Sequence, residues 1–266
     1  MEPTPLAFLF LDESMDESLD LASLTGVLVP SHAYREVRDA LCKLVWEILA
    51  PAPNTVPAPI ELHGRNLLPE LAHLPVEQAD AARLRVLQRI VGIVNDNALR
   101  VFRVCYLNRV EIAAAMRHDP KLYGINFFGI QAALQDLMEQ TLVVPVMDGV
   151  PNSANTNKPP AIDPSLIRAF AGNVRWLHHT RQSDAVKNSL SVRNAHNLGE
   201  PVFADSTHAT MLQMVDLVSY LILQLDRDEL AAESTASPFK QSVVLTARTF
   251  HPQLLELWRG RMQVNV

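Results

Sequence analysis

Four carboxylates stand where an enzyme would place reactive groups. Asp12 and Asp148 each close an apolar run that is typical of a buried strand, and Glu61 follows a proline-rich loop. Asp216 lies inside an otherwise apolar run, where an unpaired carboxylate would be costly. In open α/β sheets the strand ends deliver functional groups to a common crevice. We therefore expect these four acids to meet at one site.

Carboxylates that share a site repel one another and raise each other's pKa unless a cation neutralises them. Mg²⁺ and Mn²⁺ suit this role because hard cations prefer oxygen ligands. Two such ions, held about 3.5–4 Å apart, can activate water and stabilise the leaving oxygen in phosphodiester cleavage. The acids thus predict a Mg²⁺ or Mn²⁺ site for phosphoryl chemistry.

Other polar residues lie close to these acids in the chain. Gln213 is three residues before Asp216 and should share its helix face. His208 lies near the start of the same helix, and His63 shares the side of Glu61 if that stretch is extended. Either histidine can be a metal ligand or a proton donor, or simply a surface or hydrogen-bonding residue.

Each acid also has an ordinary structural explanation. Asp12 and Asp148 can end strands in turns, where aspartate is common. Glu61 can cap a helix or face solvent, and Asp205 can be the N-cap of the late helix. Asp216 is the hardest to explain this way, because its neighbours in the chain are apolar.

The hydrophobic pattern predicts the elements that position these residues. Short apolar or alternating runs predict five strands, at Leu6–Leu11, Leu21–Pro30, Ala98–Leu107, Thr141–Asp148 and Val174–Thr180. Apolar residues spaced by three and four predict helices at Tyr34–Leu49, Val76–Asn95, Leu122–Gln140 and Ser206–Leu225. The last part, Val243–Arg261, is expected to be a helical tail.

Composition narrows the class of protein. The chain has 266 residues, of which 48% are hydrophobic and 20% charged, as in ordinary globular domains. Its N-terminus does not have the pattern of a secretory signal, and no apolar run reaches the roughly 18–20 residues of a membrane span. Cys42 and Cys105 are far apart and are expected to be reduced core residues. A cytoplasmic protein without membrane contact is expected.

Charge and motifs exclude several kinds of function. The net charge of −6 argues against coating nucleic acid by surface charge, but not against a nuclease whose metal ions meet the phosphate. Two distant cysteines provide no thiolate zinc site. The phosphate-loop, dinucleotide-binding and hydrolase-elbow glycine motifs do not occur.

Four segments resemble, in the same order, the motifs of the domain of unknown function 3800 (DUF3800) family. FLFLDESMD resembles its opening motif, IELHGRNL its Glu-x-His motif, VVPVMD its central strand and FADSTHATMLQMVDLVSYLI its closing motif. The resemblance covers about residues 6–225 and implies a ribonuclease H-like fold with a metal-dependent nuclease site. The family often occurs in bacterial and phage-related defence settings. Met15 stands where the opening motif usually has glycine, so the turn after Asp12 is expected to differ in shape.

The resemblance also implies roles for individual residues. Its acidic motif positions correspond to the four carboxylates named above. Its supporting positions correspond to Glu13, His63, Asp205 and Gln213.

We therefore predict a single α/β domain of ribonuclease H-like fold. It would contain a five-stranded mixed sheet flanked by helices, with strands one to three antiparallel. A helical insertion over residues 31–97 would bring Glu61 to the site, and residues 226–266 would form a C-terminal helical tail.

The predicted function is hydrolysis of phosphodiester bonds in RNA or DNA, with His63 or His208 moving protons. Arg181, Lys187 and Arg193 lie in a polar segment that is expected to contact phosphates, unless it is only a solvated loop. Two alternatives remain. One is a nucleic-acid- or protein-binding module of the same fold without catalysis. The other is a metal-dependent phosphohydrolase acting on small phosphate esters.

Overall fold

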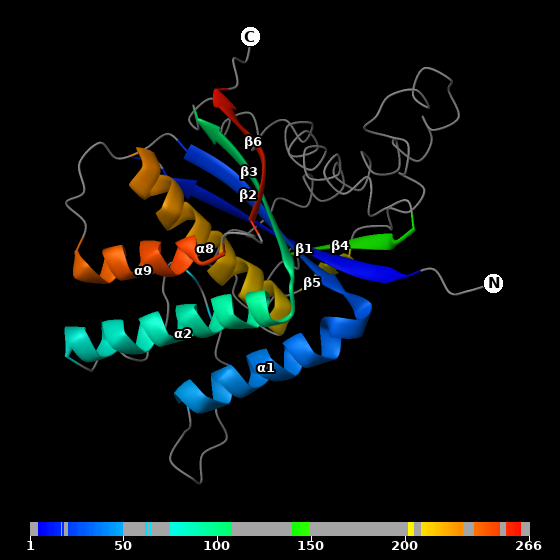
Figure 1. The fold of residues 1–266 in the computed structure, drawn as a ribbon, viewed down its shortest axis with the longest axis horizontal. Coiled ribbons are helices and arrows are strands. Elements are labelled where there is room, and N and C mark those ends of the chain that lie inside the picture. Colours follow the sequence, from blue (N-terminus) through cyan, green and yellow to red (C-terminus); the bar gives the residue numbers. More distant parts are fainter. Residues whose placement is uncertain are drawn as a thin grey trace, which may run out of the picture.

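The computed structural model describes residues 5–16, 18, 21–49, 62, 64, 75–107, 140–148, 202–204, 209–230, 237–250 and 254–261. Within these ranges the chain has a mixed α/β fold, in which helices pack on a mixed sheet (Figure 1). None of the helices in the described ranges has the length and apolar character needed to span a membrane.

Four strands form the centre of the sheet: β1 (Leu6–Asp16), β2 (Leu21–Pro30), β3 (Arg100–Leu107) and β4 (Leu142–Asp148). Two further strands extend it at the sides, β5 (Val202–Ala204) and β6 (Leu254–Arg261), and the order is β5-β4-β1-β2-β3-β6. The β1–β2 and β2–β3 pairs are antiparallel, as predicted. The other three pairs, β1–β4, β4–β5 and β3–β6, are parallel.

The described residues include four helices, α1 (Ser31–Leu49), α2 (Val76–Asp96), α8 (Thr210–Leu230) and α9 (Pro238–Arg248). The predicted helices of these regions are thus confirmed, although α8 starts and ends later than expected. All four helices pack on one face of the sheet and share one buried hydrophobic cluster with it. The sheet residues in this cluster include Phe10, Val27, Val29 and Val101. Figure 1 shows these helices together on one side of the strands.

Strand β1 is longer than predicted, because it runs past the apolar segment as far as Asp16. Strand β2 pairs with it residue by residue up to the Asp16–Leu21 pair, so backbone hydrogen bonding continues where the side chains become polar. The Asp16 carboxylate is satisfied by the Ser18 amide and hydroxyl. Asp12 therefore lies inside a strand, not in a turn at its end.

The predicted helical tail is wrong in its last part. Helix α9 begins at Pro238, after Ser237 accepts a hydrogen bond from the Lys240 amide, and it ends at Arg248. Residues Leu254–Arg261 then form β6 beside β3. The outer edge of β3 offers unpaired backbone groups, which a strand satisfies and a helix would not. The expected strand Val174–Thr180 lies outside the described residues, and so does the expected helix Leu122–Gln140 except for Gln140, which is in a turn. Within the described part the sheet has six strands instead of five.

Two ion pairs join α8 to the sheet. Arg103 of β3 pairs with Asp226, and both side chains are buried. Arg227 pairs with Asp16 of β1, where Asp16 is buried and Arg227 is partly exposed. These ion pairs hold the C-terminal half of α8 against the first and third strands.

Candidate functional site

The parallel pairing of β1 with β4 brings two of the predicted acids together. The register pairs Leu6 with Leu142 and continues to Leu11 with Met147. One residue further along each strand come Asp12 and Asp148. Neighbouring strands lie about 4.7–4.9 Å apart, so these two positions are adjacent in the sheet. The side chain of Asp148 is outside the described part of the structure.

Helix α8 covers the face of β1 to which Asp12 belongs. Ser14 Oγ lies 2.6 Å from Ser219 Oγ of α8, and Asp16 is paired with Arg227 of the same helix. Alternate residues of a strand point to the same face, so Asp12 shares this face with Ser14 and Asp16. The Asp12 side chain is partly buried there.

Gln213 and Asp216 of α8 hold a segment that comes from between α1 and α2. The Leu62 amide donates to Gln213 Oε1 at 3.4 Å, and the Gly64 amide donates to Asp216 Oδ2 at 3.1 Å. The two acceptors therefore share one face of the helix, as their spacing of three predicts. Gln213 is buried, so its hydrogen bond is shielded from water.

Gly64 packs so closely on α8 that a side chain does not fit. A Cβ atom at this position would lie 2.5 Å from Tyr220 Cβ and 3.2 Å from the Asp216 carbonyl oxygen. Leu62, two residues earlier, is buried in the core between the helices and the sheet. The chain neighbours of Glu61 and His63 are thus anchored beside Asp216, while these two residues themselves lie outside the described residues.

Two ionisable groups next to this face have shifted pKa values. Burial raises the pKa of Asp16, but hydrogen bonds from Ser18 and Arg227 and the charge of Arg227 outweigh it, so the pKa is below its ordinary value. Burial raises the pKa of the Tyr220 hydroxyl above its ordinary value. Asp16 is therefore ionised at neutral pH, and Tyr220 keeps its proton.

Two of the predicted carboxylates have described side chains. Asp12 lies on the face of β1 that α8 covers, and Asp216 of α8 accepts a hydrogen bond from the Gly64 amide. No group of three or more His, Cys, Asp or Glu side chains suited to a metal occurs among the described residues. The other two expected ligands lie outside the described part, namely the side chain of Asp148 and the whole of Glu61.

The side chains of the remaining predicted site residues lie outside the described part of the structure. Glu13 lies in β1 opposite Leu24, but its side chain is outside the described part. The others fall in ranges that the structure does not describe, namely Asp205, His208, Arg181, Lys187 and Arg193.

Sequence reasoning missed the hydroxyl groups on this face. Ser23 and Thr25 of β2 are buried and lie opposite Ser14 and Asp12 in the antiparallel pair. The signal was present in LASLTGVLVP, where polar residues alternate inside an apolar strand. Tyr220 and Gly64 were also missed, because their contact joins distant segments.

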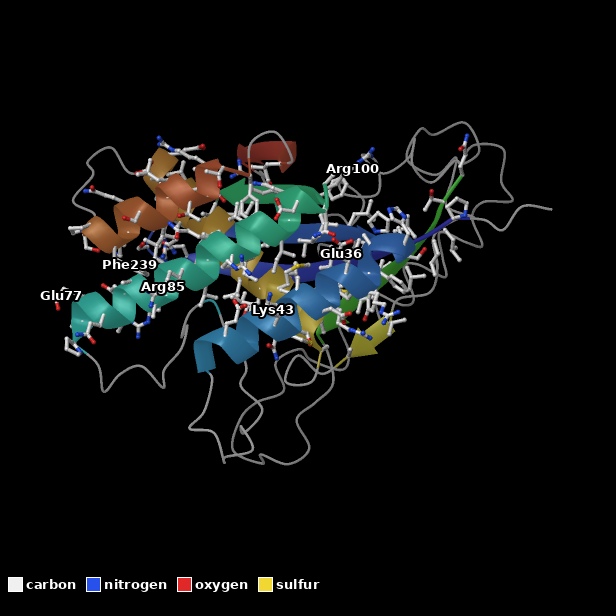
Figure 2. The ribbon with its side chains drawn as sticks, turned by 60° about the horizontal axis from the view of Figure 1, so that its bottom comes forward. Glu36, Lys43, Glu77, Arg85, Arg100 and Phe239 are labelled. Carbon is white, nitrogen blue, oxygen red and sulfur yellow. The ribbon has the colours of Figure 1, made fainter. Side chains whose placement is uncertain are left out.

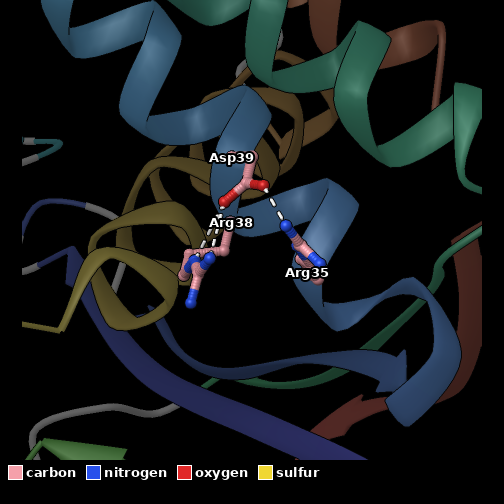
Figure 3. Close-up of polar contacts among 3 residues, drawn as sticks. All are labelled: Arg35, Arg38 and Asp39. Atoms are coloured by element: carbon pink, nitrogen blue, oxygen red, sulfur yellow. Dashed lines mark hydrogen bonds and ion pairs between the residues drawn. The ribbon is translucent and has the colours of Figure 1, made fainter.

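The exposed faces of α1 and α2 have charges of both signs. Figure 2 shows Glu36 and Lys43 on α1 and Glu77 and Arg85 on α2 pointing away from the sheet. On α1, Asp39 accepts from Arg38 at 2.8 Å and lies 3.7 Å from Arg35 (Figure 3). Further pairs join Glu47 to Lys43 and Arg89. This surface has the mixed charge of a solvated face and gives no sign of a basic strip for nucleic acid.

Comparison of the chain with protein-family models, with curated proteins and with solved structures gave no match.

Proposed function

We propose that this protein is a metal-dependent nuclease of ribonuclease H-like fold that belongs with the DUF3800 proteins. Asp12, Glu61, Asp148 and Asp216 would hold Mg²⁺ or Mn²⁺, and the substrate would be RNA or DNA. The observation on which this rests is the meeting of three distant chain segments. The β1–β4 register runs up to Leu11 and Met147, the residues directly before Asp12 and Asp148. The amides of Leu62 and Gly64 donate to Gln213 and Asp216 of α8.

The strand directions support the proposed fold. The first three strands are antiparallel neighbours, and β4 joins the opposite side of β1 in parallel. This makes the first and fourth strands neighbours inside the sheet, and each of them has an acid that the family resemblance assigns to the site.

The donor set fits the proposed ions, because all four groups are carboxylates and hard divalent cations prefer oxygen ligands. When bound, such ions would activate water and stabilise the charge that develops on a phosphodiester. The protein's own residues would do the rest. Gln213 and Asp216 accept hydrogen bonds from the Leu62 and Gly64 amides, and His63 or His208 would move a proton at the reacting oxygen.

Nuclease activity is tested with Asp12→Asn and Asp148→Asn, assayed on RNA and DNA oligonucleotides with Mn²⁺ or Mg²⁺. Loss of a supporting residue costs roughly 10–100-fold in metal sites, so loss of a ligand should reduce cleavage by more than that. Asp39→Asn is the matched control, because Asp39 is an exposed acid on α1 with only surface ion pairs. It should cleave like the wild type.

Wild-type cleavage by both Asp12→Asn and Asp148→Asn would refute the proposed site. Small phosphate esters, tested in parallel, address the alternative of a general phosphohydrolase. Turnover of these esters without oligonucleotide cleavage would favour that alternative.

A further inference from the structure

The face of the sheet beneath α8 includes a row of polar side chains. The antiparallel registers pair Asp12 of β1 with Thr25 of β2, and Thr25 with Arg103 of β3. One pair further along, Ser14 lies opposite Ser23. Directly opposed residues of antiparallel strands have Cβ atoms about 4.5–5.5 Å apart on the same face. Thr25 thus lies between the Asp12 carboxylate and the Arg103–Asp226 ion pair.

In the described part of the structure, two hydroxyls of these pairs have no hydrogen-bond partner. Thr25 is 0% exposed and Ser23 is 4% exposed, and neither Thr25 Oγ1 nor Ser23 Oγ makes a hydrogen bond. Valine or alanine would fill such positions without leaving a polar atom unsatisfied. A hydroxyl at such a position therefore has the capacity to donate to a partner that the described structure does not contain.

For Thr25, the register points to the Asp12 carboxylate as the nearest acceptor. A carboxylate that binds a metal ion is usually held in turn by a hydrogen-bond donor outside the coordination sphere. Thr25 is the residue directly opposite Asp12, and its side chain is enclosed, so water does not compete for the hydroxyl.

We propose that Thr25 is a positioning residue whose hydroxyl donates to the Asp12 carboxylate when Asp12 holds a divalent cation. This inference rests on the proposed function. Its role is to fix the direction in which the Asp12 carboxylate presents its oxygens, so loss of the hydroxyl should weaken cation binding by about tenfold.

The test compares Thr25→Val, Thr25→Ser and Ser23→Ala in the full chain. Thermal unfolding is measured in EDTA and along a Mn²⁺ titration, which gives an apparent Kd for Mn²⁺ from the rise in Tm. Valine keeps the shape of threonine and its preference for strands but removes the hydroxyl. Serine keeps the hydroxyl. Ser23 is the matched control, because it is a buried and unpartnered hydroxyl on the same strand and face that lies opposite Ser14 instead of Asp12.

We expect Thr25→Val to unfold in EDTA at the wild-type Tm or above it, and to need about ten times more Mn²⁺ for the same stabilisation. Thr25→Ser and Ser23→Ala should bind Mn²⁺ like the wild type. Equal Mn²⁺ affinity in Thr25→Val and the wild type would overturn the inference.

Two other outcomes would also overturn it. A lower Tm of Thr25→Val in EDTA, with Mn²⁺ affinity unchanged, would assign the hydroxyl to the neighbouring Arg103–Asp226 pair. Equal weakening in Thr25→Val and Ser23→Ala would indicate a general packing effect. A wild-type chain that Mn²⁺ does not stabilise would refute the proposed function itself, which separates that failure from failure of the Thr25 assignment.

Discussion

At the scale of single residues, Asp216 has two separable roles. Its Oδ2 atom accepts the hydrogen bond from the Gly64 amide, which is a structural role. In the proposed function, the negative charge of the same carboxylate would also bind a cation. An asparagine side chain keeps an oxygen acceptor but loses the charge, whereas alanine loses both. These two substitutions therefore distinguish a structural acid from a metal ligand.

We predict that Asp216→Ala lowers the Tm in EDTA and that Asp216→Asn lowers it much less. A buried amide left without an acceptor costs about 1–3 kcal/mol, and each kcal/mol lowers the Tm by roughly 2–4 °C in a chain of about this size. Both variants should lose the stabilisation by Mn²⁺, as measured by thermal unfolding. Mn²⁺ stabilisation that survives in Asp216→Asn would leave Asp216 with its structural role only.

Gly64 provides a second prediction at this scale. Alanine would place its Cβ 2.5 Å from Tyr220 Cβ, an atom close to the α8 backbone that cannot move aside cheaply. We expect Gly64→Ala to destabilise the fold by about 1–3 kcal/mol, as overpacking does, in urea unfolding experiments.

The matched control is Gly92→Ala in α2. A Cβ at Gly92 meets nothing within 4 Å, so alanine should stabilise that helix by about 0.5–1 kcal/mol. Opposite signs for the two glycines are the expected result. A neutral Gly64→Ala would contradict the close packing of this segment on α8.

At the scale of elements, α8 is the helix that joins the parts of the site. Its N-terminal half holds the Leu62–Gly64 segment through Gln213 and Asp216. Its C-terminal half is fixed to the sheet by Arg227 with Asp16 and by Asp226 with Arg103. These ion pairs fix the position of α8 on the sheet and thereby the position of Asp216 relative to β1.

The Asp16–Arg227 pair makes part of this attachment depend on pH. The pKa of Asp16 is lower in the folded chain than its ordinary value of 3.8, so folding favours the charged form. The stability that Asp16 contributes is therefore complete above pH 3.8 and is lost as the pH falls through the lowered pKa.

We predict that Asp16→Asn is less stable than the wild type at neutral pH and that the difference shrinks below pH 3.8. Urea unfolding at a series of pH values measures this difference. Asp39→Asn, which removes an exposed acid with surface ion pairs, should show little effect at any pH. A difference for Asp16→Asn that stays constant with pH would exclude the charge of Asp16 as its cause.

At the scale of the whole molecule, metal binding and folding are coupled if the proposed site exists. Its ligands come from β1, β4, α8 and the segment before α2, which meet only in the folded chain. A cation that binds these groups together therefore stabilises the native state alone.

We predict that Mn²⁺ at about 100 times its Kd stabilises the wild type by about 2.7 kcal/mol, which raises the Tm by roughly 5–10 °C. EDTA should reverse the rise. Calorimetry or fluorescence-monitored unfolding measures it, and Asp12→Asn should reduce it. If Mn²⁺ and EDTA give the same Tm for the wild type, the carboxylates do not form a cation site.

Much of the fold could be predicted from local patterns in the chain. Strand β1 is predicted from the apolar run before Asp12, and β2 and β3 are predicted from apolar or alternating residues. Helices α1, α2 and α8 are predicted from apolar residues spaced by three and four. The C-terminal strand β6 could not be predicted in this way. It pairs with β3 across a separation of about 150 residues, and its local pattern does not favour strand over helix.

The sequence by itself determined which residues can do chemistry here and which elements hold them, because side-chain type and hydrophobic period are local properties. Only the tertiary structure decided which of them meet. The pairing of β1 with β4 makes the positions of Asp12 and Asp148 neighbours in the sheet, and the amides of Leu62 and Gly64 bond to Gln213 and Asp216 of α8. Both result from hydrogen bonds and packing between segments more than 100 residues apart, whose free energy depends on the whole core and not on any one stretch of chain.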